Sequence, residues 1–217
     1  ASFGVSAAMS LGMDNVDSVF EIQQELQPGA ARYFTAGRGI TRSEPGRTEA
    51  PYWVNTPEEA RAAVQAEAAR GVDIIKIWVD DRNGSYEKLT PELYGAVIDE
   101  AHQQGIRVTA HLFFQDDAAG LLEAGVDAFA HGVRDKDFDA DFLALYQAHP
   151  DVVLVPNLPN RGIPTEYSWL EGLVPDETLQ RLNAQTANPD AQAGFGIQAR
   201  NLNRLYHAGI TVALGTD

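Results

Sequence analysis

The feature that most constrains the fold is a junction that occurs five times, in which a glycine leads into an apolar run. These glycines are Gly4, Gly71, Gly105, Gly125 and Gly209. In four of the five, a helix-like segment comes before the glycine. Glycine ends helices in this way because it adopts a left-handed backbone conformation without steric cost. Repeated helix-to-strand junctions predict an α/β chain with a parallel sheet.

Two helix starts are marked as clearly as the helix ends. Thr56-Pro57-Glu58-Glu59 combines an N-cap threonine, a proline at the first helical position and a glutamate at the third. This capping box predicts a helix that ends near Arg70. Thr90-Pro91-Glu92 repeats the cap and the proline before apolar residues with helical spacing. Helices and strands are therefore expected to alternate.

The apolar runs predict seven strands, at 5–11, 31–36, 74–79, 107–112, 128–131, 152–157 and 211–215. Alternating units of this kind build either an open doubly wound sheet or a closed barrel, which usually has eight strands. The 217 residues, of which 44% are hydrophobic, suit one domain over 1–217. Two longer loops, 37–52 and 156–175, would lie on the rim of a barrel, as walls of a substrate site or as ordinary surface connections.

Composition excludes several classes of partner. The 16 basic and 31 acidic residues give a net charge of −15, so nucleic acid and anionic membranes are poor partners. No apolar stretch reaches the roughly 20 residues that span a bilayer. We expect a soluble protein and favour the cytoplasm, with the periplasm and secretion left open. Without cysteine, a transition metal must be held by histidine, carboxylate or a modified lysine.

Four polar residues lie in or just after apolar runs, where strands would bring them to one rim of a barrel. Imidazole and carboxylate are common ligands for zinc and similar metals. A lone histidine at a strand end is more often a satisfied core residue, but two at equivalent positions favour a shared site. The four residues are Lys76, His111, His131 and Asp217.

Lys76 interrupts the run Ile-Ile-Lys-Ile-Trp-Val, where a charged ammonium would be desolvated. It therefore needs a partner or a modification, and three explanations are open. The lysine could pair with a neighbouring carboxylate such as Asp80. It could be an imine-forming lysine with a depressed pKa. It could also be carbamylated by carbon dioxide, so that the new carboxylate bridges two metal ions.

These stretches resemble the amidohydrolase superfamily, especially its imidazolonepropionase-like and prolidase-like metal-dependent hydrolases. The stretches that match are 73–77, 108–111, 130–132 and 214–217. The resemblance implies a distorted (β/α)8 TIM-like barrel with one or two divalent metals, zinc above all. Lys76 would match the carbamylated lysine on strand four, and His111 and His131 the ligands on strands five and six. Asp217 would match the aspartate on strand eight.

The sequence also departs from the family pattern. The family has a His-x-His pair on strand one, which this sequence lacks, and further chain after strand eight. We therefore expect an incomplete barrel, an internal portion of a longer enzyme without strand one and the small flanking β domain.

The resemblance implies a hydrolase that cleaves an amide or related carbonyl bond in a dipeptide, an N-acyl amino acid or a cyclic amide. A metal-activated water would attack the carbonyl, Asp217 would shuttle the proton, and His131 would contact a metal or the oxyanion. A substrate carboxylate could be bound by arginine, with Arg38, Arg42 and Arg161 as candidates.

Two other functions stay open at this point. One is a Schiff-base, aldolase-like barrel enzyme that uses unmodified Lys76. The other is a non-catalytic barrel fragment whose ligands are relics. In the enzymatic interpretations the partner is a small-molecule substrate, and a homo-oligomer is left open.

Overall fold

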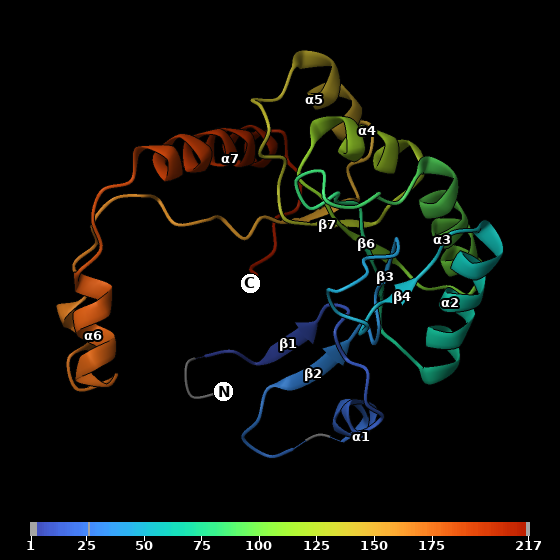
Figure 1. Ribbon diagram of the computed structural model, residues 1–217, viewed down its shortest axis with the longest axis horizontal. Helices are drawn as coiled ribbons and strands as arrows, with labels where there is room; N and C mark the ends of the chain where they lie inside the picture. Colours follow the sequence, from blue (N-terminus) through green and yellow to red (C-terminus); the bar gives the residue numbers. More distant parts are fainter. Residues whose placement is uncertain (1–3, 26, 216–217) are drawn as a thin grey trace.

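A computed structural model describes residues 4–25 and 27–215, and strands and helices alternate along them (Figure 1). The strands are β1 (Ala7–Ser10), β2 (Arg32–Thr35), β3 (Ile40–Thr41), β4 (Tyr52–Trp53), β5 (Ile75–Trp78), β6 (Val108–His111), β7 (Ala128–Ala130) and β8 (Val153–Val155). The helices are α1 (Ser18–Gln24), α2 (Pro57–Arg70), α3 (Pro91–Gln103), α4 (Gln115–Glu123), α5 (Ala140–Gln147), η1 (Ser168–Leu170), α6 (Asp176–Asn183) and α7 (Pro189–His207).

Every pairing between these strands is parallel, as predicted. β1 and β2 form one sheet, and a second sheet has the order β4-β3-β5-β6-β7-β8. The backbone N–H of Asp73 donates to the Thr35 carbonyl at 2.9 Å, which ties the end of β2 to the start of β5. Over the described residues the sheet does not close into a barrel, so what the structure shows of the expected (β/α)8 fold is its parallel α/β architecture.

Six of the predicted strands are confirmed as β1, β2, β5, β6, β7 and β8. Within the seventh, at 211–215, the structure has only a bridge between Val212 and Leu154. β3 and β4 were not predicted and lie at 37–53, most of which was expected to be a loop. Each is two residues long, which is too short for an alternating pattern to show in the sequence.

The predicted helix boundaries are confirmed. The Thr56 side chain accepts a hydrogen bond from the Glu59 backbone, and the Glu59 carboxylate accepts one from the Thr56 backbone. The Thr90 side chain caps α3 by accepting from the Leu93 backbone. All five junction glycines have φ between 71° and 88°, the left-handed region that strains other residues.

Two junctions carry the same Gly-Val-Asp tripeptide, and the aspartate makes the same contact in both. Oδ2 of Asp73 accepts from the Thr35 backbone N–H at 2.8 Å, and Oδ2 of Asp127 accepts from Val108 at 2.7 Å. Each aspartate precedes its own strand and ties the start of that strand to its neighbour. A hydrogen bond to a charged group contributes roughly 1.5–3 kcal/mol, so these two bonds hold the start of β5 against the end of β2 and the start of β7 against the start of β6.

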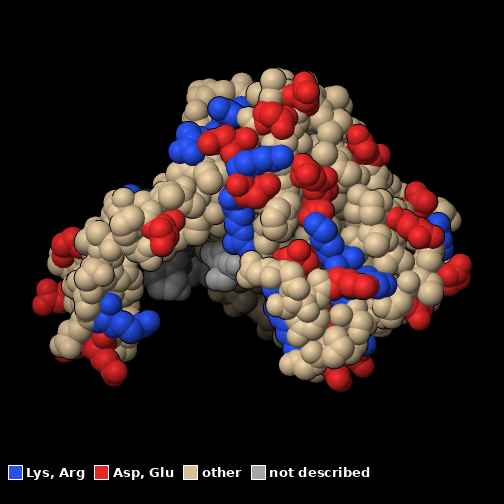
Figure 2. Space-filling model, turned by 45° about the horizontal axis from the view of Figure 1, so that its top comes forward, with Lys and Arg blue, Asp and Glu red and all other residues tan. Residues whose placement is uncertain are grey.

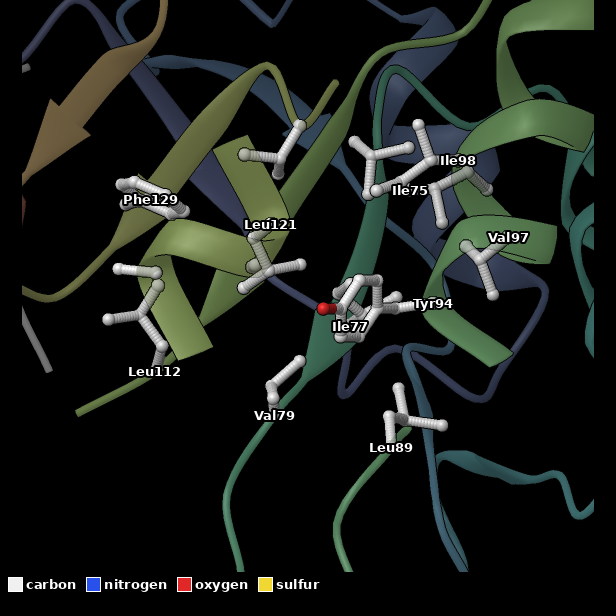
Figure 3. Close-up of a cluster of buried hydrophobic side chains, with 14 of the residues drawn as sticks. Ile75, Ile77, Val79, Leu89, Tyr94, Val97, Ile98, Leu112, Leu121 and Phe129 are labelled. Atoms are coloured by element: carbon white, nitrogen blue, oxygen red, sulfur yellow. The ribbon is translucent and has the colours of Figure 1, made fainter. Parts of the chain in front are cut away.

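The core lies between the sheet and the helices α2 to α5, which follow one another along one face of the sheet (Figure 1). Figure 3 shows Ile75 and Ile77 of β5 beside Tyr94 and Ile98 of α3. Successive strand residues point to opposite faces. Lys76, which lies between these isoleucines, therefore points away from the helices.

The segment 158–188 extends from this body, and α6 stands apart from the other helices (Figure 1). No side chain of α6 is buried, and Trp169 and Leu173 are 67% and 73% exposed.

Acidic and basic side chains are interspersed over the face of the molecule shown in Figure 2. Among the described residues, no helix combines the length and the apolar character needed to cross a bilayer.

Candidate functional site

A cavity of about 450 Å³ lies on the side of the sheet that faces away from the helices. Its polar lining residues are Arg47, Thr48, Lys76, Arg82, His111, His131 and Asn157. Three of the four residues predicted to form a metal site, Lys76, His111 and His131, therefore share one cavity. Asp217, the fourth, lies outside the described residues.

Lys76 is buried at the middle of β5, with 3% of its surface exposed. Its ammonium lies 5.3 Å from the ring centre of Trp78, two residues along the same face. Glycines make room for this pair. A Cβ on Gly12 would lie 2.5 Å from the Trp78 ring and 2.8 Å from the Lys76 side chain, and one on Gly39 would lie 2.0 Å from Trp78.

His111 and His131 face each other across the strand ends of β6 and β7. Their ring centres are 4.6 Å apart with the rings nearly perpendicular, and Phe113 packs 4.3 Å from His111. The backbone of His131 has φ of 81°, and its N–H donates to the Val155 carbonyl at 2.8 Å. A left-handed residue other than glycine costs about 1–3 kcal/mol and is most common at functional sites.

The surroundings of His111 keep its ring neutral. Burial lowers the pKa of His111 to about 4, against the opposing hydrogen bond with Asp80, and the nearby Lys76 and His131 charges lower it further. Nε2 of His111 lies 3.2 Å from Oδ2 of Asp80. Burial raises the pKa of Asp80, but hydrogen bonds from His111 and Arg82 lower it to about 2. The neutral ring thus donates from Nε2 and keeps a lone pair on Nδ1.

This donor chemistry fits a divalent metal, because a neutral imidazole fixed by a carboxylate on its other nitrogen is a common ligand. Within 4–25 and 27–215, however, no group of three His, Cys, Asp or Glu side chains is placed to hold a metal ion. Zinc binding and a carbamylated Lys76 therefore stay predictions.

Four charged residues at the edge of the cavity form a network that the sequence did not reveal as a unit. Glu44 is 2% exposed and accepts from Arg47 at 2.5 Å and from Arg82 at 3.0 Å. Arg82 also donates to Asp80 at 2.6 Å. The segment 80–83 directly follows the predicted strand that contains Lys76, and this position in the sequence indicates a turn that could orient a ligand. Glu44 and Arg47 have no comparable signal in the sequence around them.

The three arginines predicted as carboxylate binders lie elsewhere. Arg38 stacks 4.0 Å from the Tyr52 ring and donates to carbonyls of its own loop. Arg42 pairs with Glu87, and Arg161 is exposed. None of the three lines the cavity.

Asn157 is a further residue that sequence reasoning missed. It follows β8, as His131 follows β7, and its φ is 40°. It lines both the main cavity and a neighbouring one of about 280 Å³, which also includes His131. Within the described part of the chain, its buried Oδ1 has no hydrogen-bond partner. Because buried polar atoms are normally paired, this oxygen is suited to a ligand N–H. Its position at the end of the predicted strand 152–157 is the sequence feature from which it could have been predicted.

Comparison with protein sequences finds relatives but no matching family model. Uncharacterised proteins of Mycobacterium tuberculosis and Mycobacterium bovis are each 38% identical over 135 residues, which is 59% of this chain and 35% of the relative. The chain thus matches about a third of the length of these curated relatives.

Solved structures resemble nearly the whole chain. A candidate prolidase from Bifidobacterium longum has a TM-score of 0.71 at 25% identity, over 99% of this chain and 52% of that one. A Xaa-Pro dipeptidase crystallised with methionine has a TM-score of 0.69 at 22% identity, over 99% and 55%. Phenylurea hydrolase B has a TM-score of 0.71 at 19% identity, over 99% and 52%. The chain therefore shares its fold with about half of each of these proteins.

Proposed function

We propose that the protein is a metal-dependent hydrolase that cleaves an amide or related carbonyl bond in a dipeptide, an N-acyl amino acid or a cyclic amide. The observation that carries this proposal is the position of Lys76, His111 and His131 around one cavity. They lie on neighbouring strands of a fold shared with amidohydrolase-type enzymes.

The ligands would be His111, His131, Asp217 and Lys76 as its carbamate, and they would hold one or two divalent ions, zinc first. A metal held there supplies Lewis-acid chemistry, which lowers the pKa of a water molecule and polarises the substrate carbonyl. Burial keeps His111 in the neutral form that binds metals, and the Asp80 carboxylate orients the ring through its contact at Nε2.

The chain's own groups handle the proton and the developing charge. Asp217 accepts a proton from the attacking water as the bond between the water oxygen and the carbonyl carbon forms. When the carbon–nitrogen bond breaks, Asp217 gives this proton to the leaving nitrogen. His131 lies on the cavity wall, where it would contact a metal or hydrogen-bond the carbonyl oxygen as negative charge develops there.

Replacement of the proton carrier tests this proposal. Asp217→Asn in the intact protein should abolish turnover of N-acyl amino acids and dipeptides, because an amide cannot accept the proton. Metal content, measured by elemental analysis, should be retained. Turnover close to that of the unmodified protein would refute the proton-shuttle role.

A Schiff-base enzyme is the second candidate, because Lys76 is buried and lines the same cavity. Borohydride would reduce an imine between Lys76 and a carbonyl substrate, and the β5 peptide would gain the mass of the substrate less its carbonyl oxygen. Loss of activity on chelation, without borohydride trapping, would favour the hydrolase.

A further inference from the structure

The cavity is basic although the protein is acidic. Among the described residues, every titratable side chain that lines it is a lysine, an arginine or a histidine. The chain as a whole has a net charge of −15. Clefts lined by one sign of charge concentrate ligands of the opposite sign. This cavity is therefore suited to an anionic group.

We propose that Arg47 and Arg82 form a subsite for a free carboxylate of the substrate. This inference rests on the proposed hydrolase function and narrows its substrate class. Dipeptides and N-acyl amino acids carry such a carboxylate, whereas a cyclic amide without one would be a poor substrate.

Arg82 is held in place before any ligand binds. Residues 82, 83 and 84 have φ of 54°, 60° and 79°, so a left-handed turn begins directly after Asp80 and Asp81. Nε of Arg82 donates to Glu44 at 3.0 Å, and Nη1 donates to Asp80 at 2.6 Å. A guanidinium has five N–H donors in a fixed plane. The two bonds fix that plane and leave other donors for a ligand.

Arg47 complements Arg82 from the opposite side of Glu44. Its guanidinium donates to Oε2 of Glu44, whereas Arg82 donates to Oε1 of the same carboxylate. The Arg47 side chain is 43% exposed, in contrast to 2% for Glu44. The formal charges of these two arginines balance those of Glu44 and Asp80, but the cations line the cavity and the buried carboxylates do not. An incoming carboxylate thus meets guanidinium N–H groups first.

The remaining walls suit the rest of such a substrate. Met9, Met13 and Trp78 are apolar and line the same cavity as the two arginines. A ligand that carries both an apolar side chain and an anionic group therefore matches the lining of this cavity.

A pair of substrates that differ only at the carboxylate tests the subsite. The intact protein should hydrolyse N-acetylmethionine with a kcat/KM about 10 to 100 times that of N-acetylmethionine amide, mainly through KM, because a hydrogen bond to a charged group is lost. Arg47→Gln should remove most of this preference, and Arg47→Lys should restore part of it. Arg200→Gln should leave it unchanged, since Arg200 pairs with Asp137 on the surface. Circular dichroism checks that each variant folds.

The outcomes separate this inference from the proposed function. Hydrolysis of acid and amide at equal rates, unchanged in Arg47→Gln, would overturn the subsite and leave the hydrolase standing. If neither compound is hydrolysed, calorimetry of N-acetylmethionine binding decides. Binding that Arg47→Gln weakens at least tenfold supports the subsite without the hydrolase, and absent or unchanged binding overturns it.

Discussion

His111 illustrates how one buried side chain couples the candidate site to the stability of the protein. Its pKa is about 4 in the folded chain, against an ordinary value of 6.5. Between these two values the unfolded chain binds the proton and the folded chain does not. The free energy of unfolding therefore rises as pH increases from 4 to 6.5 and is level above that range, by an amount on the order of 3 kcal/mol.

The variant His111→Gln should flatten this dependence in protein stripped of metal. Urea unfolding at pH 4.5, 5.5 and 6.5 measures the slope for the variant and for the unmodified protein. His207→Gln, at an exposed position, serves as the control and should keep the original slope. An unchanged slope in His111→Gln would show that this ring does not carry the effect.

Single residues also mark what a sequence can and cannot reveal. Lys76, His111 and His131 could be found because each interrupts or ends an apolar run. Glu44 and Arg47 could not, because neither follows a predicted strand and the contact of Glu44 with Arg82 joins positions 38 residues apart. The candidate site was thus predicted where it depends on strands and missed where it depends on loops.

At the scale of elements, the helices were the most predictable part. Local chemistry fixes their ends, as the reciprocal hydrogen bonds of Thr56 and Glu59 show. The short β3 pairs with β5, and β4 pairs in turn with β3, so both strands depend on tertiary partners. Sequence patterns therefore give the order of the elements better than the extent of each strand.

Two glycines inside helices allow a matched test of packing. A Cβ on Gly95 in α3 would meet no neighbouring atom within 4 Å, whereas one on Gly120 in α4 would lie 2.3 Å from the Tyr94 hydroxyl. Gly95→Ala should stabilise the protein by about 0.5–1 kcal/mol, because alanine loses less backbone entropy in a helix. Gly120→Ala should destabilise it, since Tyr94 is buried and must shift. Equal effects in thermal unfolding would contradict the packing described for Tyr94.

At the scale of the whole molecule, the body and the segment 158–188 differ in how firmly they are held. The helices α2 to α5 pack on the sheet, whereas α6 buries no side chain. Local opening costs least where few apolar contacts must break. The segment 158–188 is therefore the part of the described chain that should open most readily.

Limited trypsin digestion should show this difference. The first cuts are expected after Arg161 or Arg181, which are exposed in this segment, with the body left as a larger product. Mass spectrometry of early products identifies the sites. First cuts within α2 to α5 would contradict the expected order of opening.

The twin aspartates Asp73 and Asp127 anchor the strands at the end remote from the cavity. The segment 158–188 can consequently be changed in protein engineering without changing the sheet that carries the candidate site. A library that randomises exposed positions of 158–188 could be screened for binding of new ligands. The positions of Lys76 and His111 on their strands should stay the same in every member. Such a library would rely on the repeated Gly-Val-Asp tripeptide to hold the strands in place.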